Sequence, residues 1–256
     1  MDFAIDRIVT SSTKDFCIFA DIGVECMESL EPWSIDYFED MFAKPDPWKY
    51  RTSHYERMKY QRQLDIIKDR NPDPQRILEI GCAEGAQTLL LAEQFPRARI
   101  TAVEISSNAF KRAEDNTRPF ADRITLVNAD IAECQTQLRE KYYDVIVWSE
   151  SIYYLGGRLQ MTTMYNLLGK ILNKLKVTGL LVMANTVNLP EELPESTVTR
   201  RPFLDCYHVI LSSLILSVSR ATYVEEKAGR MYEYQIWAFA RQDTGSLANV
   251  KPWLEF

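Results

Sequence analysis

Apolar and polar positions follow two different periods along the middle of the chain. Short runs rich in Ile, Leu and Val, typical of buried strands, are separated by segments in which apolar residues recur every three or four positions, as in amphipathic helices. The pattern predicts strands over 76–80, 99–105, 123–131, 143–150 and 179–187, and helices over 85–95, 107–117, 132–140 and 161–175. Strands and helices that alternate in this way indicate a parallel sheet covered on both faces.

The flanking segments extend this architecture at both ends. Helices are predicted over 34–41 and 53–69, with Pro45 and Pro47 interrupting the chain between them. After a polar, proline-containing segment, a helix is predicted over 203–214, followed by the strands "LSVSRATYVEE" and "YEYQIWAFAR". The short connection "KAGRM" makes these two strands an antiparallel hairpin. The expected fold class is therefore α/β, a doubly wound, mostly parallel sheet of seven strands with an antiparallel edge.

The same pattern divides the chain into four segments. Residues 1–33 are expected to be an N-terminal extension, and residues 34–70 to be helices that form a lid over a site. Residues 71–242 are the predicted core, and residues 243–256 a C-terminal tail. The length of the core is that of one α/β domain.

Composition and charge narrow the classes of function. The 256 residues carry a formal net charge of −6, which argues against a nucleic-acid partner because phosphate binding relies on clustered Lys and Arg. No apolar run approaches the length of a membrane span, and the first residues carry acids, so we expect no membrane segment, no secretory signal and a cytoplasmic location. Five scattered cysteines and two histidines predict no metal site. A small-molecule substrate is expected, bound by a monomer or homodimer.

The turn after the first predicted strand, "EIGCAEG" (79–85), is the first candidate for ligand binding, because such sheets bind ligands beyond the carboxyl ends of their strands. It has only two glycines, Gly81 and Gly85, with Ala83 between them, so it departs from a dinucleotide-binding turn. Glu79 would repel a pyrophosphate and favour a cationic ligand. S-adenosylmethionine is such a ligand, since it carries a sulfonium and an amino group but no phosphate.

Two further acids end the next two predicted strands. Glu104 can accept hydrogen bonds from both hydroxyls of a ribose, while Asp130 can accept from an adenine amino group with Ile131 packed on the ring. The alternatives are a solvated strand-end charge for Glu104 and a helix N-cap for Asp130. Three acids at three successive strand ends favour ligand binding.

The run "ILEIGCAEGAQT…AVEIS…NADI…YDVIVWSESIYYL…GLLVMAN" resembles class I S-adenosylmethionine-dependent methyltransferases. The segments "PDPWKYRTSHYERMKYQRQLDII" and "SESIYYL" narrow the resemblance to the nodulation protein S methyltransferases over about residues 34–187, with Ala83 in place of that family's usual middle glycine. The resemblance implies a Rossmann-like sheet in the order 3-2-1-4-5-7-6 with strand 7 antiparallel. It also implies S-adenosylmethionine as the cofactor, with contacts from Glu79, Gly81, Ala83, Gly85, Glu104, Ile105, Asp130, Ile131 and Ser149.

The end of the fourth strand, "SESIYYL", supplies candidate substrate residues. Glu150 stands where it could bind an ammonium group and take its proton as a catalytic base. Tyr153 and Tyr154 could hold a cation against their rings. The alternatives are a capping role for Glu150 and core packing for the two tyrosines.

The segment "PWKYRTSHYERMKY" supplies a second candidate wall. Trp48 and Tyr50 are predicted to cover the substrate or to pack at the surface. His54, the only histidine near the expected site, is a candidate catalytic proton acceptor or an exposed residue in the first turn of a helix.

Arg57, in the same segment, is a candidate cofactor ligand. It shares a helical stripe with Tyr60, Leu64 and Ile67, which is an unusual place for a charge. It also resembles a family position, and its guanidinium could pair with the carboxylate of the cofactor's methionine end. The alternative is an arginine whose stem packs while its head reaches water.

Together these features predict an S-adenosylmethionine-dependent methyltransferase that acts on a small molecule in specialised metabolism, preferably at an amine nitrogen. The expected substrate is cationic or amino-bearing. In-line displacement of the methyl group depends mainly on alignment of the nucleophile and exclusion of water. Methylation of a hydroxyl is the alternative within this class, and a nicotinamide-dependent oxidoreductase or a regulatory protein with the same fold are the alternatives outside it. Cys82 is expected to contribute its backbone alone.

Overall fold

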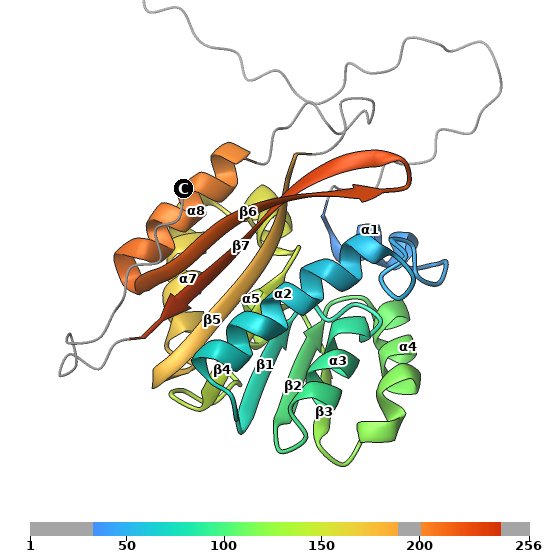
Figure 1. Ribbon diagram of the computed structural model, residues 1–256, viewed down its shortest axis with the longest axis horizontal. Coiled ribbons are helices and arrows are strands. Elements are labelled where there is room, and N and C mark those ends of the chain that lie inside the picture. Colours follow the sequence, from blue (N-terminus) through green and yellow to red (C-terminus); the bar gives the residue numbers. More distant parts are fainter. Residues whose placement is uncertain (1–32, 189–200, 242–256) are drawn as a thin grey trace, which may run out of the picture. The chain divides into compact units, whose positions relative to one another are not determined.

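A seven-stranded sheet forms the centre of the protein in the computed structural model, which describes residues 33–188 and 201–241 (Figure 1). Its strand order is β3-β2-β1-β4-β5-β7-β6. β7 pairs antiparallel with β5 and β6, while the other neighbours pair in parallel, which confirms the predicted fold class. The strands are β1 (Arg76–Ile80), β2 (Arg99–Glu104), β3 (Ile124–Asn128), β4 (Tyr143–Ser149), β5 (Leu175–Asn188), β6 (Leu216–Lys227) and β7 (Arg230–Ala240).

Helices cover both faces of the sheet, with α2 and α3 on one face and α7 and α8 on the other (Figure 1). Within the described ranges, none of the helices combines the length and apolar character needed to cross a membrane. The helices are α1 (Ile35–Met41), α2 (His54–Arg70), α3 (Ala86–Gln94), α4 (Ser107–Thr117), α5 (Ile131–Cys134), α6 (Ile152–Arg158), α7 (Met161–Leu172) and α8 (Arg201–Leu214), with a 3-10 turn at Arg118–Phe120.

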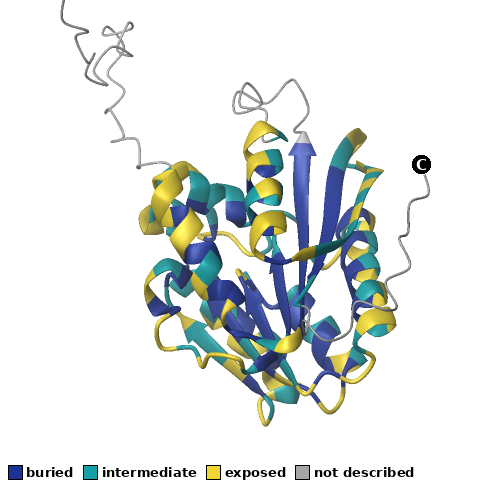
Figure 2. Cartoon of the chain, turned by 90° about the vertical axis from the view of Figure 1, so that its left-hand side faces the viewer, coloured by how far each residue is buried: buried dark blue, intermediate teal, exposed yellow. Residues whose placement is uncertain are grey.

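Side chains that alternate along each strand build two hydrophobic clusters, one on each face. The central strands are accordingly buried over most of their length (Figure 2). In β1, Ile77 belongs to the cluster under α2 and α3, while Leu78 belongs to the cluster under α7 and α8. The large rings of Trp148 and Trp237 are fully buried in the second cluster. Burial of apolar surface stabilises the fold by about 25 cal/mol per Å². It also fixes the ends of the parallel strands at a common edge, where their loops meet.

Some predicted boundaries are wrong, each for a local reason. β3 ends at Asn128 and α5 begins at Ile131, because the side chain of Asp130 accepts a hydrogen bond from the Ala132 N–H and caps the helix. α7 ends at Leu172, and β5 begins earlier than predicted, at Leu175. The predicted extension up to residue 32, the polar segment within 189–200 and the predicted tail at 243–256 lie outside the described residues.

α6 is a helix that the sequence pattern did not predict. It contains two adjacent glycines, Gly156 and Gly157, and glycine disfavours helices. Both glycines allow close approaches. A Cβ on Gly156 would lie 2.6 Å from Cζ of Tyr207 in α8, and a Cβ on Gly157 would lie 2.8 Å from Cδ1 of Trp33. The missing side chains therefore let α8 and Trp33 pack directly on α6.

We expect Gly156→Ala to lower the free energy of unfolding by about 1–3 kcal/mol, because the added methyl group overlaps the buried ring of Tyr207. Urea unfolding followed by circular dichroism measures the change. Gly169→Ala in α7 is the matched control, since nothing lies within 4 Å of its Cβ position. Gly169→Ala should raise the free energy of unfolding by about 0.5–1 kcal/mol, because alanine favours the helix over glycine. Equal effects of the two substitutions would contradict the close packing of α6 on α8.

Candidate functional site

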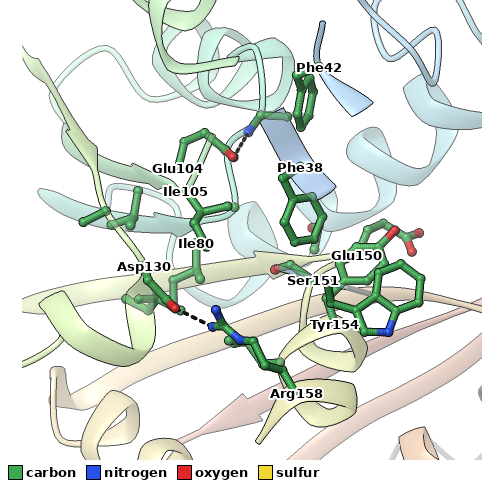
Figure 3. A pocket seen from close by; sticks show the side chains of 18 of the residues that line it. Phe38, Phe42, Ile80, Glu104, Ile105, Asp130, Glu150, Ser151, Tyr154 and Arg158 are labelled. Carbon is green, nitrogen blue, oxygen red and sulfur yellow. Dashed lines mark hydrogen bonds and ion pairs between the residues drawn. The ribbon is translucent and has the colours of Figure 1, made fainter. Parts of the chain in front are cut away.

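A pocket of about 700 Å³, counted with its open mouth, lies beyond the carboxyl ends of β1, β2, β3 and β4 (Figure 3). Parallel strands end at this edge, so the loops that follow them meet there. Three acids line the pocket: Glu104 at the end of β2, Asp130 after β3 and Glu150 after β4. Aromatic side chains from the N-terminal segment close the opposite side. The acids and the aromatic wall are the two parts of the site.

The turn between β1 and α3 has an unusual backbone. Gly81, Ala83 and Gly85 have positive φ angles of 75°, 48° and 81°. Glycine adopts this left-handed region freely, whereas an alanine there is strained. The N–H groups of Gly81 and Cys82 both donate to the carbonyl oxygen of Val103, at 2.9 and 3.1 Å. Ala83 therefore keeps the tight turn that the sequence predicted, in a conformation that suits glycine better.

Glu104 joins this turn to the start of α4. One carboxylate oxygen accepts from the Ala83 N–H at 2.8 Å, and the other accepts from the Ser106 N–H at 2.8 Å. The residue is only 5% exposed. Burial raises the pKa of Glu104 to about 7, although these backbone hydrogen bonds act in the opposite direction. The carboxylate is thus fixed in place and still faces the pocket.

Asp130 has both of the roles that its sequence position offers. One oxygen caps α5 by accepting from the Ala132 N–H at 2.9 Å, and the residue lines the pocket. The other oxygen pairs with the guanidinium of Arg158, which reaches across from the end of α6 (Figure 3). The sequence analysis missed Arg158, because the helix that carries it was not predicted.

A smaller pocket adjoins the first and extends behind the turn. Glu79, Gln87, Tyr50 and Tyr60 line it, together with the turn itself. Glu79 is 2% exposed. Burial, with the nearby charge of Glu104, raises the pKa of Glu79 to about 7, although the side-chain hydroxyl of Thr88 acts in the opposite direction. Oε2 of Glu79 and Nε2 of Gln87 are buried without a hydrogen-bond partner in the protein. Such groups are rare in folded proteins and need a partner, which can be a water molecule, an ion or a ligand.

Glu150 is held by four hydrogen bonds. Oε1 accepts from Nζ of Lys59 at 2.6 Å and from Oγ1 of Thr186 at 2.8 Å. Oε2 accepts from the Thr186 N–H at 3.0 Å and from the Tyr153 hydroxyl at 2.7 Å. Burial favours protonation, but Lys59 and the other donors outweigh it and lower the pKa of Glu150 to about 2. Its backbone also has a positive φ of 55°, so the residue is fixed in a strained conformation.

A buried chain of charges runs from Glu150 to the edge of the sheet. Lys59, 1% exposed, contacts Glu150 and also Glu56, the latter with 2.8 Å between Nζ and Oε2. Lys227 in β6 pairs with the other oxygen of Glu56 at 2.6 Å. Lys59 and Glu56 lie on the buried face of α2, beside the apolar residues that the sequence pattern predicted there. The pattern did not place these two residues on that face, because they are charged.

Six aromatic side chains form the wall opposite the strand ends. Tyr154 in α6 packs against Trp33 and Phe38, with ring centres 4.7 and 5.2 Å apart. Trp48 continues the wall, 5.2 Å from Phe42 and 5.5 Å from Tyr50. The members of this aromatic wall are Trp33, Phe38, Phe42, Trp48, Tyr50 and Tyr154.

Two acids fix the segment that carries this wall. Glu39 in α1 accepts hydrogen bonds from the N–H groups of Ser107 and Asn108, at 2.6 and 3.0 Å, and so ties α1 to the start of α4. Glu84 in the turn accepts from the Asp46 N–H at 2.8 Å. The sequence analysis missed both acids. The hydrogen bonds anchor the segment over the carboxyl edge of the sheet.

The structure brings most of the predicted site residues together and leaves two outside. Tyr153 reaches the site through Glu150, and Gly85 is the N-cap residue of α3 at the end of the turn. His54 and Arg57 are exposed and line neither pocket, and the guanidinium of Arg57 donates to the Thr52 carbonyl at 3.3 Å. The predicted residues that line one or both pockets are Trp48, Tyr50, Glu79, Gly81, Ala83, Glu104, Ile105, Asp130, Ile131, Ser149, Glu150 and Tyr154.

Comparisons with known proteins agree with this architecture. Nodulation protein S of Bradyrhizobium diazoefficiens is 33% identical over 123 residues, which are 48% of this chain and 56% of that protein. A malonyl-[acyl-carrier protein] O-methyltransferase of Priestia megaterium is 32% identical over 112 residues, 44% of this chain and 37% of that protein. The matches thus span about half or less of these relatives.

The crystal structure of the N-methyltransferase NodS from Bradyrhizobium japonicum WM9, in complex with S-adenosyl-L-homocysteine, has a similar fold. The TM-score is 0.67 at 23% identity, over 82% of this chain and 99% of that chain. A family model described as nodulation protein S matches residues 34–187. Since that match covers more than half of the 256 residues, the chain belongs to the nodulation protein S family.

Proposed function

We propose that this protein transfers a methyl group from S-adenosylmethionine to an amine nitrogen of a small molecule in specialised metabolism. The observation that carries the proposal is the meeting, in one pocket, of the left-handed turn after β1 with the strand-end acids Glu104 and Asp130. Membership of the nodulation protein S family supports it, since a solved structure from that family is an N-methyltransferase with S-adenosyl-L-homocysteine bound.

The residues present fit this cofactor. Glu104 would accept from the ribose hydroxyls, and Asp130 would accept from the adenine amino group, with Ile105 and Ile131 as apolar neighbours in the same pocket. The unpartnered Oε2 of Glu79 suits a positively charged ligand. When bound, the cofactor supplies a methyl group on a positively charged sulfur.

The amide of Gln87 takes the place that the sequence analysis gave to Arg57. Its buried Nε2 has no partner in the protein and lines the smaller pocket, so it would donate to the carboxylate of the cofactor's methionine end. The hydroxyl-bearing rings of Tyr50 and Tyr60 line the same pocket. An uncharged donor set binds this carboxylate without bringing an additional buried cation beside the sulfonium.

The pocket favours an amine over a hydroxyl as methyl acceptor. A hydroxyl must lose its proton to become a good nucleophile and therefore needs a base, whereas a neutral amine attacks directly. Glu150 is a poor base, because its pKa is about 2 and its oxygens are hydrogen-bonded. His54 is exposed and lines neither described pocket. The aromatic wall excludes water and orients the acceptor, which supplies much of the rate in such a displacement.

A product screen tests the proposed reaction. The protein is incubated with S-adenosylmethionine and a panel of paired amines and alcohols, and mass spectrometry measures S-adenosylhomocysteine and methylated products. We expect methylated amines and at least tenfold less product from the matched alcohols. Methylation mainly of the alcohols would support O-methylation instead. Failure to bind S-adenosylhomocysteine at millimolar concentration would overturn the proposal altogether.

Cofactor affinity tests the role of Glu104. We expect Glu104→Gln to weaken S-adenosylhomocysteine binding by about 10- to 100-fold, because hydrogen bonds to a charged acceptor contribute about 1.5–3 kcal/mol. Isothermal titration calorimetry measures the dissociation constants. Arg57→Ala is the control and should leave the affinity unchanged within about twofold, since Arg57 lies outside both pockets. The reverse order of effects would restore Arg57 as the cofactor ligand.

Cofactor affinity should also rise between pH 6 and pH 8. The raised pKa values of Glu79 and Glu104, about 7, leave both partly protonated near neutral pH, and the ionised forms are those that accept hydrogen bonds from a ligand. Binding should therefore release protons, which calorimetry in buffers of different ionisation heat counts. In the ligand-free protein, the raised pKa values stabilise the fold fully below about pH 4.5, and this stability is lost as the pH rises through 7. An affinity for the cofactor that does not change with pH would contradict the assignment of Glu79 and Glu104 as its ligands.

A further inference from the structure

The net charge of the part of the pocket that would hold the methyl acceptor depends on whether each acid there has a cationic side chain as partner. Asp130 is paired with Arg158, and Glu150 is paired with Lys59. Glu104 is bonded by backbone N–H groups alone and faces the expected ribose position. Of the three acids that line the main pocket, Glu104 is therefore the one without a cationic side chain as partner, and it lies on the cofactor side.

Glu150 has no acceptor capacity left for a ligand. A carboxylate offers about four lone-pair positions. Those of Glu150 are taken by Lys59, Tyr153 and two groups of Thr186, at distances between 2.6 and 3.0 Å. A substrate ammonium could hydrogen-bond to Glu150 only by displacing one of these donors. All acceptor positions of this carboxylate are therefore used within the protein, and its role is structural.

Lys59 also removes the net negative charge of Glu150. Its ammonium lies between Glu150 and Glu56, 4.8 Å from the ring centre of Tyr55, and Lys227 balances Glu56. Two lysines and two glutamates in a row leave no unbalanced charge. In a buried environment, where charges are poorly screened, such compensation decides which ligands are attracted. The tyrosines beside this chain stay neutral, because burial raises the pKa values of Tyr50, Tyr55 and Tyr60.

We propose that Lys59 is a positioning residue that keeps Glu150 compensated and immobile, so that the site takes its acceptor nitrogen uncharged. This inference rests on the proposed N-methylation and specifies its substrate class: weakly basic nitrogen compounds, such as aromatic amines, rather than ammonium ions. The aromatic wall, with Trp33, Phe38 and Tyr154 in contact, suits a flat, apolar acceptor. A cation would find no uncompensated carboxylate on this side of the pocket, because Asp130 is paired with Arg158 and Glu150 with Lys59.

The chemistry balances without a base from the protein. The lone pair of the neutral nitrogen forms the new N–C bond, and the C–S electron pair stays on sulfur, which becomes neutral. The nitrogen then carries the positive charge and loses its N–H proton to water once the product leaves the site. A fixed, compensated Glu150 therefore holds the wall of the site without entering the reaction.

Binding of two probes of the same shape tests the inference. Benzyl alcohol is neutral and benzylamine is a cation at pH 7.5, and their dissociation constants are measured by calorimetry on the protein saturated with S-adenosylhomocysteine. We expect the wild type to bind benzyl alcohol at least tenfold more tightly. Lys59→Met exposes the charge of Glu150 and should tighten benzylamine binding at least tenfold, with benzyl alcohol unchanged. Lys59→Arg keeps the charge and should retain the wild-type preference.

Two further variants separate this role from general effects. Lys176→Met removes a lysine that pairs with Asp144 at 2.6 Å away from the pocket, and it should leave both probes unaffected. Lys59→Met combined with Glu150→Gln removes both charges and should restore the preference for benzyl alcohol, even if Lys59→Met alone folds poorly. Tighter benzylamine binding by the wild type, unchanged in Lys59→Met, would overturn the inference. Binding of S-adenosylhomocysteine, measured separately, reports on the proposed function itself.

Discussion

The acids at the carboxyl edge of the sheet are buried, and a buried carboxylate is tolerated only where donors from other elements surround it. Glu104 takes backbone N–H groups from the turn after β1 and from the start of α4. Asp130 accepts a hydrogen bond from a backbone N–H at the start of α5 and pairs with Arg158 of α6. Glu150 pairs with Lys59 of α2. Each acid therefore joins elements that are distant in the sequence. The shape of the pocket follows from how these acids are satisfied.

Glu79 is the exception to this rule, and the exception is informative. It lies in β1, between two parallel neighbours, and one of its oxygens has no partner among the protein groups around it. The amide nitrogen of Gln87, which lines the same smaller pocket, also has no hydrogen-bond partner in the protein. Leaving a buried acceptor and a buried donor unmatched costs about 1–3 kcal/mol for each group. A ligand that carries both a positive and a negative group would remove both costs together, as the methionine end of the proposed cofactor does.

The sequence predicted the parts of this structure that depend on periodicity and on position along a strand. The strands themselves, and the acids Glu104 and Asp130 at their ends, follow from alternation and from position along a strand, both of which are local. The strand order, in contrast, was implied by the resemblance to the nodulation protein S methyltransferases. The parts that were missed depend on contacts between distant elements. Arg158 was missed because the glycines of its helix make that segment resemble a loop, although Gly156 permits the contact with Tyr207 and Gly157 the contact with Trp33.

In helix α2, too, the local sequence pattern does not predict contacts with distant elements. Its apolar residues Tyr60, Leu64 and Ile67 were identified as buried, but Arg57 was placed with them and Lys59 was not. A hydrophobic pattern assigns charged residues to the exposed face unless a partner is known. Lys59 is buried because Glu56 and Glu150 surround it, and Glu150 is 91 residues away in the sequence. No periodicity carries that information.

Hydrogen bonds to a buried acid also explain how Ala83 remains in a turn that suits glycine. An alanine at a φ of 48° costs about 1 kcal/mol relative to its preferred conformations. The turn has little freedom to relax, because the Ala83 N–H is bound by Glu104 and the preceding N–H groups are bound by Val103. A strained conformation persists where its surroundings fix it from several sides. The buried acid that is expected to hold the ribose thus also holds the turn beside it.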